Sequence, residues 1–109
     1  MAQFDVHRNK GALRDSIPYV VVVQSAQFDR YRRRVVVPLV RQTILPRNTP
    51  TVGARMNPVF VIKGARVVLH PLDMVSVALD QLGEAVGSLA QEGQVIADAL
   101  DEMLTRSWG

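Results

Sequence analysis

IPYVVVVQS, residues 17–25, is a nearly continuous run of β-branched and aromatic side chains, and RVVVPLV, residues 34–40, repeats the pattern further along. Such residues favour strands, and a strand that is apolar on both faces is buried between two layers. The first run therefore predicts a central strand with both faces covered. Pro38 removes a backbone donor from the second run, so we expect that strand at a sheet edge or at a bulge.

Shorter apolar runs lie on either side of these two segments. Phe4 and Val6 alternate with polar neighbours, which predicts a first strand. Pro58 to Ile62 and Arg66 to His70 are two short apolar runs joined at Lys63-Gly64-Ala65. A glycine-containing connection of this length between two apolar runs predicts a β-hairpin.

The last part of the chain holds one ambiguous segment and one clear helix. Between Asp73 and Leu89 the apolar residues fit strand alternation and helical spacing alike, and both remain open. From about Gln91 an apolar stripe opposite an acidic face predicts an amphipathic helix. The stripe consists of Val95, Ile96, Ala99, Leu100, Met103 and Leu104, and the acidic face of Asp98, Asp101 and Glu102.

These segments predict a single domain over residues 1–109, mainly β with a C-terminal α-helix and an antiparallel sheet. A chain of 109 residues is too short for two stable cores. Its 48% hydrophobic and 21% charged residues are typical of a globular fold. Residues 41–57 hold Pro46, Pro50 and Gly53 among Arg, Asn and Thr residues, which predicts a long loop of the kind that is often functional.

Composition also excludes several classes of protein. There is no cysteine, so disulfides and thiolate metal sites are excluded. The N-terminal residues do not have the pattern of a signal peptide, and the longest apolar run is too short to cross a bilayer. His7 and His70 lie on different predicted strands without metal-ligand spacing. We therefore expect a cytoplasmic protein with no metal, no other cofactor and no membrane partner.

Charge is divided unevenly along the chain. Residues 1–70 hold twelve Lys or Arg against three Asp, a net charge of +9, whereas residues 71–109 hold seven acidic residues and one Arg, a net charge of −6. A basic half suggests an acidic partner, either a nucleic acid or an acidic peptide. Alternatively, the two halves complement each other within the fold or across a dimer.

Two groups of residues are candidates for chemistry or for nucleic-acid binding. The run Arg30-Tyr31-Arg32-Arg33-Arg34 is basic with an aromatic inside, which suits nucleic acid, a carboxylate-rich protein surface, or simply a solvated hairpin edge. His70 with Asp73 and Arg66 offers an acid–base group for RNA cleavage. The alternative for this trio is a histidine at a strand end beside an aspartate in a turn.

The end of the chain carries a candidate anchor for a partner. Ile96, Leu100 and Leu104 follow i, i+4 spacing, and Trp108 continues that series one turn later. Tryptophan is a preferred interface residue because it buries much area with few rotamers to order. The alternative is that Trp108 folds back onto the body or into a dimer interface.

With these residues in view, the sequence resembles the CcdB family, the toxins of bacterial toxin–antitoxin pairs that poison DNA gyrase. The likeness runs along nearly the whole chain, in order and spacing, and ends on tryptophan-glycine. It comprises Phe4, Val6, Val23-Gln24-Ser25, Arg33-Arg34, Val37-Pro38-Leu39, Pro58-Val59, Asp73-Met74-Val75-Ser76-Val77, Gly83-Glu84-Ala85-Val86, Leu89 and Trp108-Gly109.

The resemblance implies a homodimer of SH3-like barrel subunits of the type shared by the CcdB, Kid and MazF toxins. Such toxins are not enzymes. They bind the A subunit of DNA gyrase and trap its complex with cleaved DNA. An acidic, partly disordered CcdA-type antitoxin neutralises them, and operator DNA is bound only through the toxin–antitoxin complex.

The resemblance also implies which residues make these contacts. Gyrase binding falls on Trp108 and Gly109, with Gln27 and Phe28 contributing, and antitoxin binding falls on Arg8, Lys10 and Arg14 and on the 41–57 loop. The chain departs from the family pattern in three places: Thr105-Arg106-Ser107 is an apparent insertion before the tryptophan, an isoleucine is missing after Gly109, and Gln27-Phe28 replaces two aliphatic residues. A MazF- or Kid-like endoribonuclease and a basic nucleic-acid-binding barrel remain the alternatives.

Overall fold

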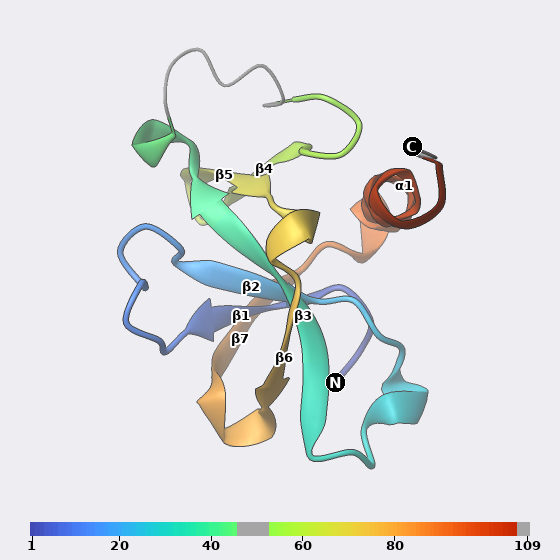
Figure 1. The fold of residues 1–109 in the computed structure, drawn as a ribbon. Helices are drawn as coiled ribbons and strands as arrows, with labels where there is room; N and C mark the ends of the chain where they lie inside the picture. The colour runs from blue at the N-terminus through green and yellow to red at the C-terminus, as the bar shows by residue number, and fades with distance from the viewer. Residues whose placement is uncertain (46–52, 107–109) are drawn as a thin grey trace.

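The computed structural model of the chain describes residues 1–45 and 53–106, and within these it forms one antiparallel sheet with one α-helix (Figure 1). The sheet order is β4-β5-β3-β2-β1-β7, and β6 also pairs with β3. The strands are β1 Asp5–Asn9, β2 Tyr19–Val22, β3 Arg33–Arg41, β4 Val59–Ile62, β5 Ala65–Leu69, β6 Val75–Ala78 and β7 Leu82–Ser88. The helix α1 covers Gly93–Asp101 and continues as the π-helical turn η6, Glu102–Arg106. The expected mainly antiparallel β fold with one C-terminal helix is confirmed.

Short 3-10 helices connect the strands. They are η1 Ala26–Phe28, η2 Gln42–Ile44, η3 Pro71–Asp73, η4 Leu79–Gln81 and η5 Ala90–Glu92. The segment from Asp73 to Leu89, which fitted both strand and helix spacing, forms β6 and β7 separated by η4. Residues 46–52 of the predicted 41–57 loop lie outside the described residues.

The strand β2 is central and buried on both faces, as predicted. Every residue from Tyr19 to Val22 is buried. Alternate side chains of a strand point to opposite faces, so Val21 joins the main hydrophobic cluster while Val20 and Val22 join a second, smaller one. Burial on both faces explains why the β-branched run shows no polar alternation.

The strand β3 connects the two parts of the sheet. Along one edge it pairs with β2, and along the other it pairs first with β6, through residues 33–36, and then with β5, through residues 39–41. Because β3 is paired along both edges and its register with β2 is regular through Pro38, the prediction of a sheet edge or a bulge is wrong. The carbonyl of Pro38 accepts from the His70 backbone at 3.1 Å, on the side where β6 pairing has ended and β5 pairing begins. Its missing N–H therefore faces a gap between two partner strands, where no ladder bond is lost.

The hairpin of β4 and β5 confirms its prediction. Ile62 pairs with Ala65, which leaves Lys63 and Gly64 as a two-residue turn. Both turn residues have positive φ, 48° and 81°, as a turn of type I′ requires. Glycine meets this requirement at the second position without strain.

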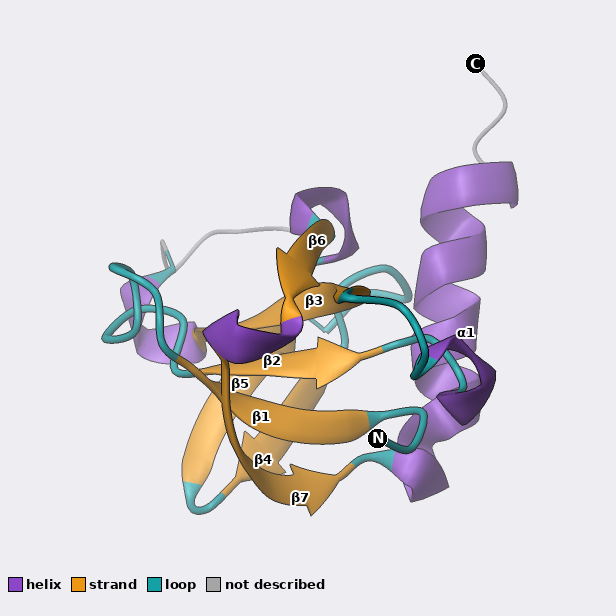
Figure 2. Cartoon of the chain, turned by 90° about the horizontal axis from the view of Figure 1, so that it is seen from below, coloured by secondary structure: helices purple, strands orange, loops and turns teal. Residues whose placement is uncertain are grey.

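The helix α1 stands beside the sheet and covers the main cluster (Figure 2). Ile96 and Ala99 are fully buried there, and Leu100 packs against the same cluster. The predicted apolar stripe is only partly in the core, because Val95 is 41% and Leu104 is 64% exposed. Within the described residues, no helix is long and apolar enough to cross a membrane.

Ion pairs connect the basic and acidic parts of the sequence. Arg8 Nε lies 2.7 Å from Glu84 Oε1, between β1 and β7. Arg55 lies 3.7 Å from Asp98 and 3.6 Å from Glu102, which links the segment before β4 to the helix. The expectation that the two charged halves complement each other within the fold is therefore met at these pairs.

Candidate functional site: two partner-facing connections

The connection between β2 and β3 carries two of the residues assigned to gyrase binding. Gln27 and Phe28 lie on η1, where Gln27 is exposed and Phe28 is half-buried. The ring of Phe28 lies 6.0 Å from the ring of Tyr31, with an interplanar angle of 35°. Tyr31 itself is 62% exposed. The connection thus presents an aromatic pair on the outside of the molecule.

A buried arginine holds this connection in place. Arg34 is 1% exposed, although its sequence neighbours Arg32 and Arg33 are exposed. Its Nη2 donates to the carbonyls of Gln24 at 2.9 Å and Ser25 at 3.1 Å, just before η1. The predicted arginine run is therefore not one surface: Arg34 is a structural member of the fold.

An acidic residue completes the arrangement around Arg34. Arg34 Nη1 donates to Asp29 Oδ1, and the amino group of Met1 donates to Asp29 Oδ2 at 3.0 Å. The bond from Met1, followed by the bond from Arg34, lowers the pKa of the Asp29 carboxyl from its ordinary value. Partial desolvation of the carboxylate opposes this shift without reversing it. The charges of Arg34, Asp29 and the Met1 amino group are thereby paired beside η1.

A groove runs along this connection on the β6 side. It measures about 470 Å³ and is lined by Gln24, Phe28, Tyr31, Arg32, Arg33, Val35 and Ser76. Arg33 Nε donates to Ser76 Oγ at 2.9 Å, which fixes that guanidinium along the groove wall. A second groove, of about 530 Å³, continues past Arg32 and Arg33 to Ala78, Leu79 and Asp80.

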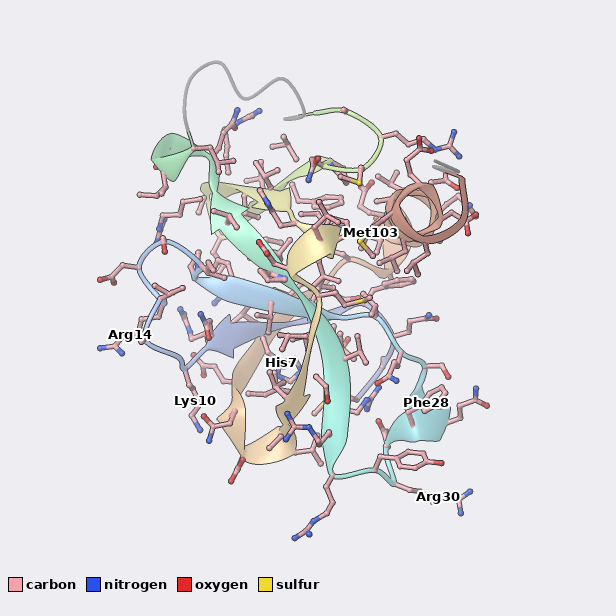
Figure 3. The ribbon with its side chains drawn as sticks, viewed as in Figure 1. His7, Lys10, Arg14, Phe28, Arg30 and Met103 are labelled. Carbon is pink, nitrogen blue, oxygen red and sulfur yellow. The ribbon has the colours of Figure 1, made fainter. Side chains whose placement is uncertain are left out.

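The connection between β1 and β2 carries the residues assigned to antitoxin binding. Arg8, on β1, pairs with Glu84 and lies 5.9 Å from the centre of the Tyr19 ring. The hydrogen bond to Glu84 is the main reason that the pKa of Arg8 is raised above its ordinary value. Lys10 Nζ donates to the carbonyl of Asp80 at 3.1 Å, and Arg14 is exposed at the tip of the connection. Figure 3 shows Lys10 and Arg14 on the opposite side of the sheet from Phe28 and Arg30.

Several hydrogen bonds close the base of this connection. The side chain of Asn9 accepts from the Gly11 backbone at 2.9 Å and donates to the Ile17 carbonyl at 2.8 Å, which closes the loop at its base. The backbone of Arg41 donates to the Ser16 carbonyl at 2.9 Å. Beneath the loop is an apolar pocket of about 220 Å³ whose walls include Leu13, Val75 and Leu82.

The three residues considered for RNA cleavage are not brought together as an acid–base group. Arg66, on β5, donates to Gln42 Oε1 at 2.9 Å, and four strand residues place it about 13 Å along the chain from His70. The His70 Nε2 atom is buried without a hydrogen-bond partner, and Asp73 is exposed on η3.

His7 lies in the interior of the protein and belongs to no metal site formed by the described residues. His7 is buried, with its Nδ1 2.9 Å from the Gly83 carbonyl, so Nδ1 carries the proton. Among residues 1–45 and 53–106, no three His, Asp or Glu side chains gather in a way that could hold a metal ion.

The remaining predicted contacts, Trp108 and Gly109, lie outside the described residues. The described chain leads toward them along η6, where Leu104 is exposed beyond the part of the helix that packs on the sheet. An exposed leucine in this position extends the apolar surface of the helix away from the core.

Sequence reasoning missed the roles of Arg34, Asp29 and Gln24 in holding η1. Gln24 Oε1 accepts from the Val35 backbone at 2.9 Å and from Arg34 Nε at 3.4 Å. One signal was present in the sequence: a single acidic residue, Asp29, directly precedes the basic run and offers its arginines an ion-pair partner. The sequence did not show which arginine would pair with Asp29, because that depends on which side chains of β3 point inward.

Comparisons with known proteins address the fold and the family. Among solved structures, the chain is similar to one titled Mycobacterium tuberculosis toxin MazF-mt6, at 14% identity and a TM-score of 0.71, over 95% of this chain and 99% of that chain. It is also similar to an endoribonuclease in complex with its cognate antitoxin, from mycobacterial species, at 17% identity and a TM-score of 0.69, over 100% of this chain and 99% of that chain. At these identities the likeness shows a shared barrel-like fold. No curated protein sequence matches the chain.

Membership of a family follows from the sequence match. A family model described as CcdB protein matches residues 3–106, nearly the whole chain. The matched range includes every strand of the sheet, both connections that flank β2, and α1. The chain therefore belongs to the CcdB family.

Proposed function

We propose that this chain is the toxin of a toxin–antitoxin pair, and that it binds the A subunit of DNA gyrase and traps the complex of gyrase with cleaved DNA. The observation that carries the proposal is the CcdB family match over residues 3–106, which supports the toxin role. The protein acts in the cytoplasm, where gyrase and its DNA are found. It acts by binding, without catalysis of its own.

The gyrase contact consists of Trp108 and Gly109 together with Gln27 and Phe28. The geometry of η1 supports its part of this contact, because Gln27 is exposed and Phe28 lies beside the exposed ring of Tyr31. Aromatic residues on a preorganised segment lose little entropy on binding, since their positions are already fixed. A homodimer would present this contact twice, which suits a two-fold symmetric target.

A CcdA-type antitoxin neutralises the toxin at the connection that holds Arg8, Lys10 and Arg14. The exposed position of Arg14 and the outward placement of Lys10 support an acidic partner segment there. Operator DNA is bound only by the complex of toxin and antitoxin.

Induced expression in gyrase-sensitive cells tests the proposal. We expect growth arrest with covalent gyrase–DNA complexes, recovered from lysed cells under denaturing conditions. Deletion of Trp108 and Gly109 and, separately, Phe28→Ala should abolish or weaken the arrest, while Val61→Ala, at an exposed residue of β4, should not. Growth arrest without covalent complexes would refute gyrase as the target while leaving the toxin role in place.

The endoribonuclease alternative is favoured by one observation, the fold shared with structures titled as endoribonucleases. The placement of Arg66, His70 and Asp73 does not favour it, because the three side chains do not form one group and His70 Nε2 is buried. Gel analysis of total RNA from the same induced cells separates the readings. Cleaved RNA that disappears with His70→Ala would support the enzyme, whereas intact RNA beside covalent gyrase complexes would support the poison.

A further inference from the structure

The arginine–aromatic groove is the groove lined by Gln24, Phe28, Tyr31, Arg32, Arg33, Val35 and Ser76. Of these residues, only Phe28 belongs to the proposed gyrase contact. The wall of the groove at Tyr31 is an aromatic ring that is 62% exposed. Phe28 supports that ring from one side, at 6.0 Å between ring centres. The exposed part of the Tyr31 ring is therefore available for a flat group to stack on it.

Cations surround this exposed ring. Arg30 and Arg32 are exposed, and their side chains form no ion pair or hydrogen bond with any residue in the described ranges. Arg33 is also exposed, with its guanidinium held in place by Ser76 through bonds of 2.9 Å and 2.5 Å. The acidic residue closest in sequence, Asp29, is already paired with buried Arg34. The arginines of the groove thus form no ion pair with a described residue, and the acidic residue Asp80 lines the adjoining groove.

Stacking surfaces and cations together select one class of ligand. Proteins that bind single-stranded nucleic acid combine a positively charged groove with aromatic rings on which bases stack. An acidic peptide would satisfy the arginines but has no flat faces for Tyr31. A duplex would satisfy the arginines too, but its base faces are already stacked within the helix.

We infer that the arginine–aromatic groove binds a segment of single-stranded nucleic acid, with one base stacked on Tyr31 and the adjacent phosphates at Arg30, Arg32 and Arg33. This activity lies beyond the proposed gyrase contact and requires only the purified chain. Because Phe28 belongs to both surfaces, a bound strand and a bound gyrase subunit compete for η1.

Fluorescence anisotropy with labelled oligonucleotides of about 12 nucleotides tests the inference. The probes are oligo(dT), oligo(rU) and a mixed-sequence DNA duplex of equal length, each titrated at about 50 mM and about 200 mM salt. We expect both single strands to bind, with at least about tenfold lower affinity for the duplex, and affinity that falls with salt. The ratio of the oligo(dT) and oligo(rU) constants then shows whether DNA or RNA is preferred.

Variants separate stacking from charge. Tyr31→Leu should weaken binding about tenfold, while Tyr31→Phe, which keeps the ring, should not. Arg32→Gln should weaken binding and reduce the slope of log affinity against log salt by about 0.7. Lys63→Gln is the control, because it removes an exposed cation from the turn between β4 and β5, outside the groove, and should leave binding unchanged.

Several outcomes would overturn the inference. They are an absence of binding at about 50 mM salt, equal affinity for duplex and single strand, no effect of Tyr31→Leu, or an equal loss with Lys63→Gln. Displacement of the oligonucleotide by poly-glutamate at equal charge concentration would assign the groove to acidic peptides instead. None of these outcomes bears on gyrase trapping, which is measured separately in cells.

Discussion

The two connections that flank β2 are built from different interactions. The first, between β1 and β2, is closed by the side chain of Asn9, by backbone bonds, and by Arg41, whose Nε donates to the Asp15 carbonyl at 2.9 Å. The second, between β2 and β3, is held by the buried charge of Arg34. The first connection therefore divides its support among several bonds, whereas the second uses one buried arginine of a basic run for support and leaves the others outside.

This difference has consequences for how each connection responds to mutation. Hydrogen bonds between neutral groups contribute about 1 kcal/mol each, and bonds to charged groups contribute about twice that. We thus expect the second connection to depend on a single side chain and the first to depend on several smaller terms.

The largest expected effect is that of Arg34→Met. The change removes the donor to the Gln24 and Ser25 carbonyls and the partner of Asp29, and should lower the free energy of unfolding by about 3 kcal/mol. Urea denaturation followed by circular dichroism measures it. Arg32→Met, at the exposed neighbour, is the control and should change stability by less than about 0.5 kcal/mol. Equal stability of the two variants would show that Arg34 is not the support of η1.

The next largest effect on stability is expected for Gly83→Ala, which tests how closely β7 packs against β1 near the first connection. A Cβ at residue 83 would lie 2.7 Å from the Arg8 carbonyl oxygen and 2.8 Å from the Arg8 Cβ. The strands must separate to admit it, at a cost of about 2 kcal/mol. The same change at Gly87, on the same strand, meets nothing within 4 Å and should be nearly neutral. Thermal unfolding of both variants gives the comparison, and a similar loss in both would contradict the close approach.

Asn9→Ala should have a smaller effect, about 1.5 kcal/mol, because it removes two neutral hydrogen bonds from the base of the first connection. Gln91→Ala, at an exposed residue of η5, serves as the control. Amide hydrogen exchange adds a local readout, since Gly11 should lose protection in the Asn9 variant while η1 is unchanged. Loss of protection at η1 as well would mean that the two connections are coupled.

The smallest effect concerns pH. The pKa of Asp29 is lowered by its partners, so its contribution to stability is present above the ordinary value of 3.8 and is lost as the pH falls below that value toward the lowered one. The difference in Tm between the parent and Asp29→Asn should therefore be constant near neutrality and shrink below about pH 4. The carboxylate is 40% exposed, so the difference should also decrease with added salt. A pH profile of Asp29→Asn that ran parallel to the parent would contradict the ion pairs of Asp29.

The comparison also shows which parts of the fold were readable from the sequence. The strand β2 and a hairpin joined at Lys63-Gly64-Ala65 were predicted, because β-branched runs and glycine-containing turns act locally, although Ala65 already belongs to β5. Pro38 was misplaced, since local rules put proline at an edge and only the tertiary pairing of β3 with two successive partners makes room for it. The exposure of Val95 and Leu104 was likewise unreadable, because helical periodicity does not say how far a helix extends past its sheet.

The candidate site was predicted mainly from the family resemblance and less from the chemistry of individual residues. Exposure of Gln27 and Arg14 suits their proposed partners, but their roles came from the family pattern. The arginine run illustrates the limit. Five residues that look alike in sequence separate into buried and exposed positions, since strand alternation places Arg34 inward and Arg33 outward.

The divided pairing of β3 has a consequence for synthesis of the protein. The second edge of β3 pairs with β5 and β6, which are synthesised later. Because residue 36 pairs with residue 75, this edge stays unpaired until about two thirds of the chain has left the ribosome. An unpaired apolar edge invites association with other nascent chains. Translation speed between β3 and β6, rather than the stability of the finished sheet, would then govern how much protein reaches its working form.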